Sequence, residues 1–432
     1  MQIQKAVFSR ILFLAALMGS SLGCTVHKAH AAEDKIYVTE YQVTLLPKEK
    51  SANVKLLVEN TEERLLRKLS FSLAKNIYSN IKSNGELTIE KQRATWLPPS
   101  GKAWLSFDVG LNHAKEKKKN GKIEYDSHIN KEWALFRGDD LFPPVKVVSV
   151  KNAQSKAKLE FKLPRSWKYV NTGWERDKTP GRKDRMGFFV NNPERNFDRP
   201  TGWIIAGDIA TRRDLLGKTV VSVSGPRRNS FEEDGVVLAR MQTLTFLHFV
   251  WPEYQKLLQD TPEKLLIVGA GSPMWRGGLS GPNSLFMHAD RPLVSENGTS
   301  TLLHEVFHSL TRISAKGKDD WIVEGLAEYY AIELLYRAGG MADERKELVY
   351  RGLQKRAKKV RKLRTGKSSG ATTAKAVLVF HELDKEIRRE TAGENSLDDV
   401  VRKLIKIRKI DLEDLHGIVN RIIKKESAAL EF

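Results

Sequence analysis

The chain has 432 residues, of which 41 % are hydrophobic, and this length suffices for two or three domains that each bury a core. Its 73 lysines and arginines outnumber its 53 acidic residues, giving a formal net charge of +20 at pH 7. Such a charge predicts either a solubilising basic surface or attraction to anionic partners. The single cysteine, Cys24, excludes an internal disulfide.

The first residues are typical of an export signal. Lys5 and Arg10 precede the apolar run 11–18, which is too short to span a bilayer. No later segment is apolar enough to cross one. We therefore expect an exported bacterial protein, periplasmic or associated with the outer envelope, without a transmembrane helix in its mature form.

Two ways of processing this signal stay open. Ala29-His30-Ala31 has the small-x-small form that ordinary signal peptidase cleaves, which makes residues 1–31 the signal peptide. Ser21-Leu22-Gly23-Cys24 resembles a bacterial lipobox, although Ser21 departs from the usual aliphatic residue. Cleavage after residue 23 would then leave a lipid anchor on Cys24.

Residues 32–235 are expected to form a β domain. Apolar and polar residues alternate there in short runs separated by turn residues, which is the pattern of half-buried strands. Many short strands at such spacing predict an antiparallel sandwich or saddle. The expected strands lie at residues 36–39, 54–58, 104–109, 133–136, 146–150, 158–161 and 219–223.

Residues 236–432 are expected to form a second, mainly helical domain. A composition shift near Gly235 leads into a helix at 240–258 and a strand at 265–268. The next segment, Gly277-Gly278-Leu279-Ser280, has glycines that permit close approach of another backbone. We expect a substrate peptide to pair with it as an added strand; a plain turn is the alternative.

A metal-binding pattern follows at His304-Glu305-Val306-Phe307-His308, within an apolar, helix-competent run. Positions four apart share one face of a helix, so His304 and His308 can direct two imidazole nitrogens at one ion, with Glu305 beside it. A second stretch, Trp321 to Tyr330, supplies Glu324 as the natural third ligand. Two imidazoles and one carboxylate leave a fourth position open for water, as in catalytic zinc sites.

Two further roles follow from this ligand set. Glu305 is expected to take a proton from the metal-activated water as general base and to pass it to the leaving amine. Glu328, four residues past Glu324 on the same helix face, is expected to accept the second N–H of a ligating histidine and so fix its tautomer.

The two stretches together resemble the gluzincin metallopeptidases, particularly the aminopeptidase N and glycyl aminopeptidase families, whose third ligand lies in a similar Trp-x-x-Glu-Gly helix. The resemblance implies one Zn²⁺ per chain, held by His304, His308 and Glu324, with Glu305 catalytic. It also implies an α+β fold, in which an N-terminal antiparallel β domain precedes a mainly helical gluzincin (thermolysin-like) catalytic domain.

The resemblance breaks at two places. Those families keep a glutamate for the substrate's free amino group where this chain has Ser280, and an oxyanion-stabilising tyrosine where it has Thr373. Exopeptidase action and the oxyanion-stabilising group therefore stay open. The candidate substitutes for the tyrosine are Tyr330, Tyr350, His288 and His381.

The remaining sequence predicts helices at residues 341–362 and 373–389, and one that Ser396 starts, with Asp399 placed as in a capping box. The basic helix at 341–362 is interpreted first as solvent-facing and second as a contact to an anionic envelope surface. No aromatic residues accompany its basic half, which argues against single-stranded nucleic acid as a partner.

The sequence thus predicts a zinc metallopeptidase that acts on peptide or protein substrates. The alternative is a zinc-binding homologue with weak or no activity that serves as an envelope binding module, because Ser280 and Thr373 replace two functional residues. A third hypothesis, a basic binder of nucleic acid or an envelope polymer, would make the intact ligand set a coincidence.

Overall fold

Alternating burial along β1 (Ile36–Leu46) and β2 (Ser51–Asn60) shows why the N-terminal residues form sheets. In β2 every second residue from Ala52 to Val58 is buried, so one face packs on the core while the other meets solvent. The two strands pair antiparallel, with Val43 opposite Val54.

The structure, a computed structural model, describes residues 35–60, 63–74, 76–117, 121–178, 185–192, 197–227 and 236–431. The predicted signal peptide, the lipid anchor at Cys24 and the domain boundary at residue 235 lie outside the described residues. Among those that are described, no helix combines the length and apolar character needed to cross a bilayer.

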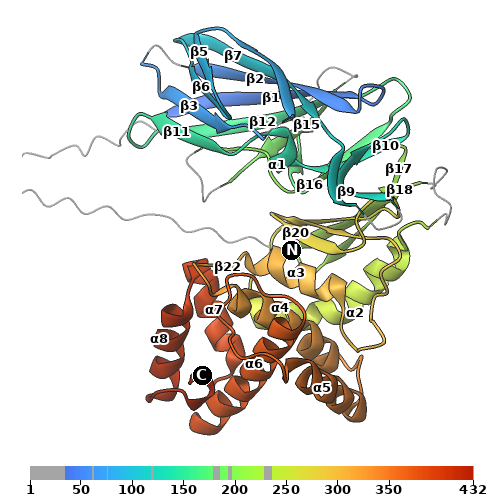
Figure 1. Ribbon diagram of the computed structural model, residues 1–432, viewed down its shortest axis with the longest axis vertical. Coiled ribbons are helices and arrows are strands. Elements are labelled where there is room, and N and C mark those ends of the chain that lie inside the picture. Colours follow the sequence, from blue (N-terminus) through green and yellow to red (C-terminus); the bar gives the residue numbers. More distant parts are fainter. Residues whose placement is uncertain are drawn as a thin grey trace, which may run out of the picture. The chain divides into compact units, whose positions relative to one another are not determined.

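Three sheets make up the N-terminal half (Figure 1). The first has the order β14 (Glu175–Arg176), β15 (Arg185–Val190), β12 (Gln154–Lys162), β1, β2, β7 (Gly101–Gly110) and β4 (Tyr78–Ser83). The second has the order β11 (Val145–Ser149), β3 (Leu66–Ser72), β6 (Arg93–Leu97) and β5 (Glu86–Glu90). The third has the order β13 (Tyr169–Thr172), β16 (Trp203–Gly207), β10 (Trp133–Arg137), β9 (Ile123–Ile129) and β8 (His113–Lys117), and the short helix α1 (Gly138–Leu141) follows β10.

One pairing departs from the expected antiparallel arrangement. β1 runs parallel to β12, with Tyr41 opposite Leu159, whereas the other strand pairs of these three sheets are antiparallel. Side chains alternate with the same period of two in both kinds of pair. The alternation therefore predicted the strands correctly but could not predict the direction of this pair.

A fourth sheet positions the candidate site. Its order is β17 (Ile209–Leu216), β18 (Thr219–Pro226), β19 (Lys264–Val268), β21 (Ser284–Met287) and β20 (Gly278–Gly281). β19 runs parallel to both of its neighbours, and the two outer pairs are antiparallel. Because β17 and β18 precede residue 235, this sheet draws on chain from both sides of the predicted boundary, which stays a prediction.

Helices follow and pack on this sheet (Figure 1). A single hydrophobic core joins them to β18, β19 and β21, while a smaller cluster that includes Trp203 and Phe286 joins the sheet to β16 and β10. The helices are α2 (Arg240–Leu258), α3 (Thr301–Thr311), α4 (Asp320–Arg337), α5 (Asp343–Ala357), α6 (Ala371–Glu390), α7 (Leu397–Ile407), α8 (Leu412–Ile423) and a 3₁₀ turn at Ala428–Leu430. A small sheet pairs β22 (Ser314–Ala315) with β23 (Lys409–Ile410).

Two helix ends test the sequence reasoning. α5 ends at Ala357 rather than at residue 362, and the residues on either side of this end are cations such as Lys355 and Lys359. Like charges four positions apart repel each other on a helix, which disfavours its extension. At the start of α7 the Asp399 carboxylate accepts a hydrogen bond from the Ser396 N–H at 2.9 Å, as the predicted capping box requires.

Candidate metal centre

Helix α3 presents the two histidines of the HExxH pattern. The Ser300 hydroxyl caps the helix by accepting a hydrogen bond from the Leu303 N–H at 3.3 Å. The helical period then puts His304 and His308 together, with ring centroids 4.7 Å apart. The apolar residues of α3 are buried in the helical core and comprise Leu302, Leu303, Val306, Phe307 and Leu310.

Helix α4 supplies the carboxylates. Glu324 and Glu328 lie one turn apart and both contact histidines of α3. Gly325 lies against α6, where an added Cβ would stand 2.5 Å from the Cβ of Ala376. Glycine therefore allows α4 and α6 to approach closely at the level of the ligands.

The three predicted ligands come together at distances that suit one ion. The Nε2 atoms of His304 and His308 are 3.1 Å apart, and the Glu324 oxygens lie 3.4 and 3.5 Å from them. Ligand atoms held about 2.0–2.1 Å from a tetrahedral zinc ion lie roughly 3.3 Å from one another. These three residues also form a group whose ligand atoms all lie within 4.8 Å of one another.

The electrostatics of the group fit a cation. Burial alone would lower the pKa of His304, but hydrogen bonds to Glu324 and Glu328 outweigh it and raise that pKa to about 10. Burial and the charge of His304 lower the pKa of His308 to about 3. The group therefore attracts positive charge into the space between its ligand atoms, and a divalent ion meets this demand with both imidazoles neutral.

Glu328 lies where a residue that orients a ligand belongs. Its Oε2 is 3.1 Å from Nδ1 of His304, on the side of the ring opposite the ligand nitrogen. A carboxylate there accepts the Nδ1 proton, which leaves the lone pair of Nε2 free for a metal.

Glu305 is buried beside the ligands, with 8 % of its surface exposed. Burial raises its pKa to about 7, assisted by the Glu324 carboxylate, while His304 and hydrogen bonding from the Ser280 backbone and hydroxyl act in the opposite direction. A carboxyl group with a pKa near neutrality can both accept and return a proton.

Strand β20 lies close to α3 because of one glycine. A Cβ on Gly278 would stand 2.7 Å from Cγ2 of Thr301 and 2.9 Å from Cγ of Glu305, so no larger residue fits. β20 ends the order of its sheet and pairs with β21, Leu279 opposite Phe286. Of the predicted segment, Gly278, Leu279 and Ser280 lie in this edge strand and Gly277 directly precedes it.

Trp203, which sequence reasoning missed, joins this strand to the N-terminal half. Its indole Nε1 donates to the Leu279 carbonyl at 2.8 Å, and its backbone N–H donates to the Ser284 hydroxyl at 2.8 Å. The contact with Leu279 spans 76 positions, so no local pattern could have indicated it.

The fold of this chain resembles that of proteins of known structure. No protein-family model and no curated protein matches the sequence. An aminopeptidase N family protein from Idiomarina loihiensis is structurally similar, with a TM-score of 0.62 and 17 % identity over 85 % of this chain and 70 % of its own. An M1 zinc metallopeptidase from Deinococcus radiodurans has a TM-score of 0.61 and 16 % identity over 92 % of this chain and 91 % of its own.

The chain has the fold of the M1 zinc metallopeptidases. Aminopeptidase A of Legionella pneumophila shares it as well, at a TM-score of 0.58 and 12 % identity over 90 % of this chain and 48 % of its own. The predicted resemblance is thereby confirmed at the level of the fold, as is the order of N-terminal sheets followed by helices.

Thr373 stands where the sequence resemblance implies a tyrosine. Thr373 lies near the start of α6, and its hydroxyl is 3.1 Å from that of Ser368. The Ser368 N–H donates to Asp320 at 2.7 Å, which ties this segment to the first turn of α4.

The four candidate substitutes make other contacts. The Tyr330 hydroxyl donates to Asp398 at 2.9 Å, and Nδ1 of His288 lies 2.6 Å from Asp290. The rings of Tyr350 on α5 and His381 on α6 lie 4.1 Å apart. Of the four, Tyr330 has its hydroxyl engaged by Asp398, whereas the buried hydroxyl of Tyr350 has no hydrogen-bond partner among the described residues.

Proposed function

We propose that this chain is a zinc-dependent peptidase, with His304, His308 and Glu324 as the ligands of one zinc ion and Glu305 as general base. The observation that carries the proposal is the spacing of the three ligand atoms at 3.1, 3.4 and 3.5 Å beside a buried carboxylate. The thermolysin-like character of the catalytic domain belongs to the same proposal.

The residues of the site divide the chemistry between them. Zinc, when bound, activates a water molecule and polarises the scissile carbonyl. Glu305, buried beside the ligands, takes a proton from the attacking water and delivers it to the leaving amine. Glu328 holds His304 in the tautomer that keeps Nε2 free for the ion, across 3.1 Å.

The free edge of β20 is the proposed place for the substrate. An extended peptide added to this strand, at the segment Gly277 to Ser280, would lie next to Glu305, because Gly278 brings the strand against α3. A variant of the Deinococcus metallopeptidase bound to the substrate Tyr-Ser-Ala supports a peptide as the substrate class. Ser280 carries no charge for a substrate's free amino group, so removal of N-terminal residues is not part of the proposal.

The test compares turnover of a peptide library by the zinc-loaded mature chain and by Glu305→Gln. Loss of the general base is expected to slow hydrolysis about 10²–10⁴-fold while zinc stays bound. Glu382→Gln, which alters an exposed glutamate of α6, is the matched control and should keep the wild-type rate. Equal hydrolysis by Glu305→Gln and wild type, with zinc present in both, would falsify the proposal.

A second candidate function has one observation in its favour. The Thr373 and Ser368 hydroxyls contact each other where a tyrosine is expected, and the Tyr330 hydroxyl is bonded to Asp398. A missing oxyanion donor lowers rates about 10²–10³-fold, which favours a zinc-binding homologue with weak or no activity that acts as an envelope binding module. Robust turnover that depends on Glu305 would remove this candidate.

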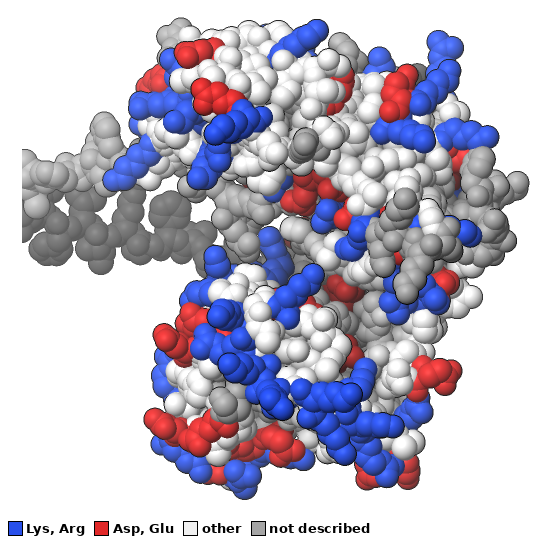
Figure 2. Space-filling view, in the orientation of Figure 1, with Lys and Arg blue, Asp and Glu red and all other residues white. Residues whose placement is uncertain are grey.

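Export to the periplasm or outer envelope, with or without a lipid on Cys24, is proposed from the sequence. Contact with an anionic envelope surface is proposed with it, and Figure 2 shows lysine and arginine side chains gathered on the face of the helical region. The exposed cations after the middle of α5 include Lys355, Lys358, Lys359, Arg361 and Lys362. Mass spectrometry of the mature N-terminus decides between the two processing routes.

A further inference from the structure

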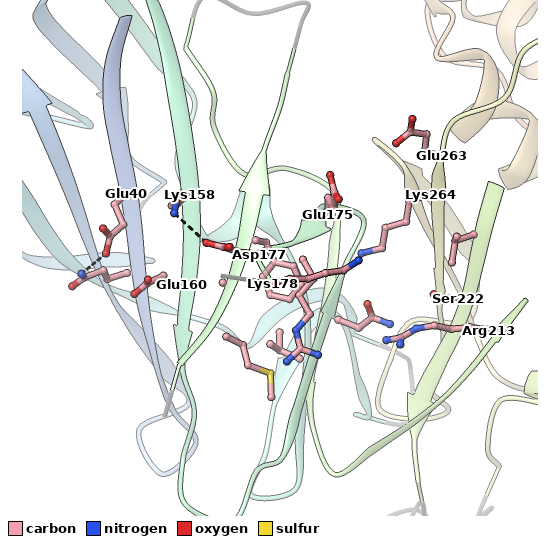
Figure 3. A pocket seen from close by; sticks show the side chains of 18 of the residues that line it. Glu40, Lys158, Glu160, Glu175, Asp177, Lys178, Arg213, Ser222, Glu263 and Lys264 are labelled. Atoms are coloured by element: carbon pink, nitrogen blue, oxygen red, sulfur yellow. Dashed lines mark hydrogen bonds and ion pairs between the residues drawn. The ribbon is translucent and has the colours of Figure 1, made fainter. Parts of the chain in front are cut away.

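A cavity of about 1300 Å³ lies apart from the metal centre (Figure 3). Strands β1, β12 and β15 line it on one side, and β17, β18 and β19 line it on the other. β18 stands three strand positions from β20, which at about 4.8 Å per strand is roughly 14 Å along the sheet. Among the described residues, none of those assigned to the metal centre lines this cavity.

Two cations from neighbouring parts of one sheet meet in the cavity. Lys264 opens β19, and its Nζ donates to the carbonyl of Trp174. Burial, assisted by the charge of Arg213 on β17 and opposed by Glu175, lowers the pKa of Lys264 to about 8. Lys178 points toward the middle of the cavity from the opposite wall (Figure 3).

Five carboxylates line the cavity, and of these Glu175 acts on Lys264 and only partly opposes the fall in its pKa. Asp177 pairs with Lys158 at 3.1 Å, and Glu40 accepts a hydrogen bond from the Gln42 amide at 2.5 Å, both near the far wall (Figure 3). Glu263 points away from the middle. Burial of an ammonium group is unfavourable unless an opposite charge joins it, and Glu175 does not restore the pKa of Lys264, so a further anion beside Lys264 and the exposed Arg213 would stabilise the charged lysine.

The surroundings suit an extended chain better than a small ion. β13, β14 and β17 each line the cavity and each ends the order of its sheet. Edge strands offer backbone N–H and C=O groups to another strand. Val170, Met186, Phe188 and Val220 add apolar surface for side chains.

We propose that this cavity is a second binding site, which takes an extended peptide segment and receives a carboxylate of that segment on Lys264 and Arg213. The site binds peptide without hydrolysing it, so the proposal stands whether or not the metal centre is catalytically active. Charges of both signs along the walls match a peptide, whereas a polyphosphate or a lipid head group presents negative charge alone.

The test measures fluorescence anisotropy of labelled pentapeptides, with alternating leucine or valine and glutamate residues, on the zinc-loaded full chain. All proteins carry Glu305→Gln so that the probe is not cleaved. Arg213→Gln and Lys264→Met are each expected to weaken binding about tenfold, since each removes a charge-assisted contact. The double change Lys355→Gln and Lys359→Gln removes two exposed charges from α5 and the residues after it, and should alter the affinity less than twofold.

Two further probes identify the source of the carboxylate. A peptide with glutamine in place of glutamate tests the side chain, and a peptide with a C-terminal amide tests the chain end; one of the two should bind about tenfold more weakly. Equal weakening by the cavity and control variants would overturn the proposal, because attraction would then follow net charge. Wild-type affinity in Arg213→Gln would overturn the proposal as well. Because Arg213 is exposed, this variant keeps the proposal testable even if Lys264→Met misfolds. Inorganic phosphate that displaces all three probes equally would also overturn it, since the site would then bind any anion.

Discussion

The metal centre and the cavity around Lys264 are two clusters of ionisable side chains that are unbalanced in opposite directions. In the first, Glu324 and Glu328 raise the pKa of His304 to about 10 against the effect of burial. In the second, burial and Arg213 lower the pKa of Lys264 to about 8. These shifts fit the two proposals, a cation held by the first cluster and a carboxylate received by the second.

The two clusters also differ in the elements that hold them. α3 and α4 fix the ligands of the metal centre to within 3.1–3.5 Å of one another, which imposes a defined geometry on one ion. The cavity takes its cations from β17, β19 and the segment after β14, and its volume of about 1300 Å³ leaves room for a longer ligand. The rigid metal centre therefore suits a reaction at one ion, whereas the roomier cavity suits the binding of a longer ligand.

The largest effect is expected when one metal ligand is removed, and it should be confined to the metal centre. His308→Ala removes one of three ligands, so zinc should fall from one ion per chain to below detection, with hydrolysis reduced more than about 10³-fold. Metal analysis after dialysis and peptide turnover check this. His248→Ala, which alters an exposed histidine paired with Asp214, is the control and should keep both zinc and activity. Full zinc content in His308→Ala would show that the ion lies elsewhere.

A smaller effect is expected from the residue that orients a ligand. Glu328→Gln keeps the shape but weakens the hydrogen bond to Nδ1 of His304, and zinc affinity should drop about 10–100-fold. Competition with a chromogenic chelator measures the affinity, and Glu382→Gln serves as the surface control. Peptide binding in the cavity should be equal in both variants. Unchanged zinc affinity would mean that Glu328 does not act on the metal through His304.

The contrast between the two sites explains what the sequence could predict. His304 and His308 lie four positions apart on one helix and Glu324 and Glu328 four apart on the next, so helical periodicity alone placed the members of each pair on one face. Alternation likewise located β1, β2, β7, β10, β11, β12 and β18, but the strands between them, such as β3 to β6, were not predicted. Lys264, Arg213 and Glu175 come from three strands far apart in the chain, and their meeting depends on the pairing of sheets, which alternation does not encode.

The interface with the N-terminal half was beyond sequence reasoning for the same physical reason. Trp203 reaches Leu279 across 76 positions, and the parallel pairing of β1 with β12 joins residues such as Tyr41 and Leu159. Thr373 was identified as a departure from the related families, but its hydroxyl partner Ser368 appeared only in the structure. Local patterns therefore predicted several elements and the grouping of the candidate metal ligands, while contacts between distant elements required the fold.

The smallest expected effect concerns the cavity and depends on pH. A lysine in the unfolded chain has a pKa near about 10.4. In the folded chain the pKa of Lys264 is about 8, lowered by burial and by Arg213 against the effect of Glu175. Between these two values the unfolded chain binds a proton that the folded chain does not, so the free energy of unfolding should rise with pH. The rise is about 1–2 kcal/mol in total, because part of the side chain is exposed.

Comparison with Lys264→Met isolates this contribution, since other titrating groups contribute equally to both proteins. The difference in unfolding free energy, wild type minus variant, should increase steadily from pH 7.5 to pH 10 in denaturant titrations. Lys355→Met, which removes an exposed lysine of α5 that does not line the cavity, is the matched control. A saturating glutamate-containing probe should flatten the Lys264 curve, because a bound carboxylate favours the charged ammonium and restores its pKa. A difference that is constant with pH would mean that burial and Arg213 do not disfavour the charged form of Lys264, and the anion assigned to the cavity would lose its electrostatic basis.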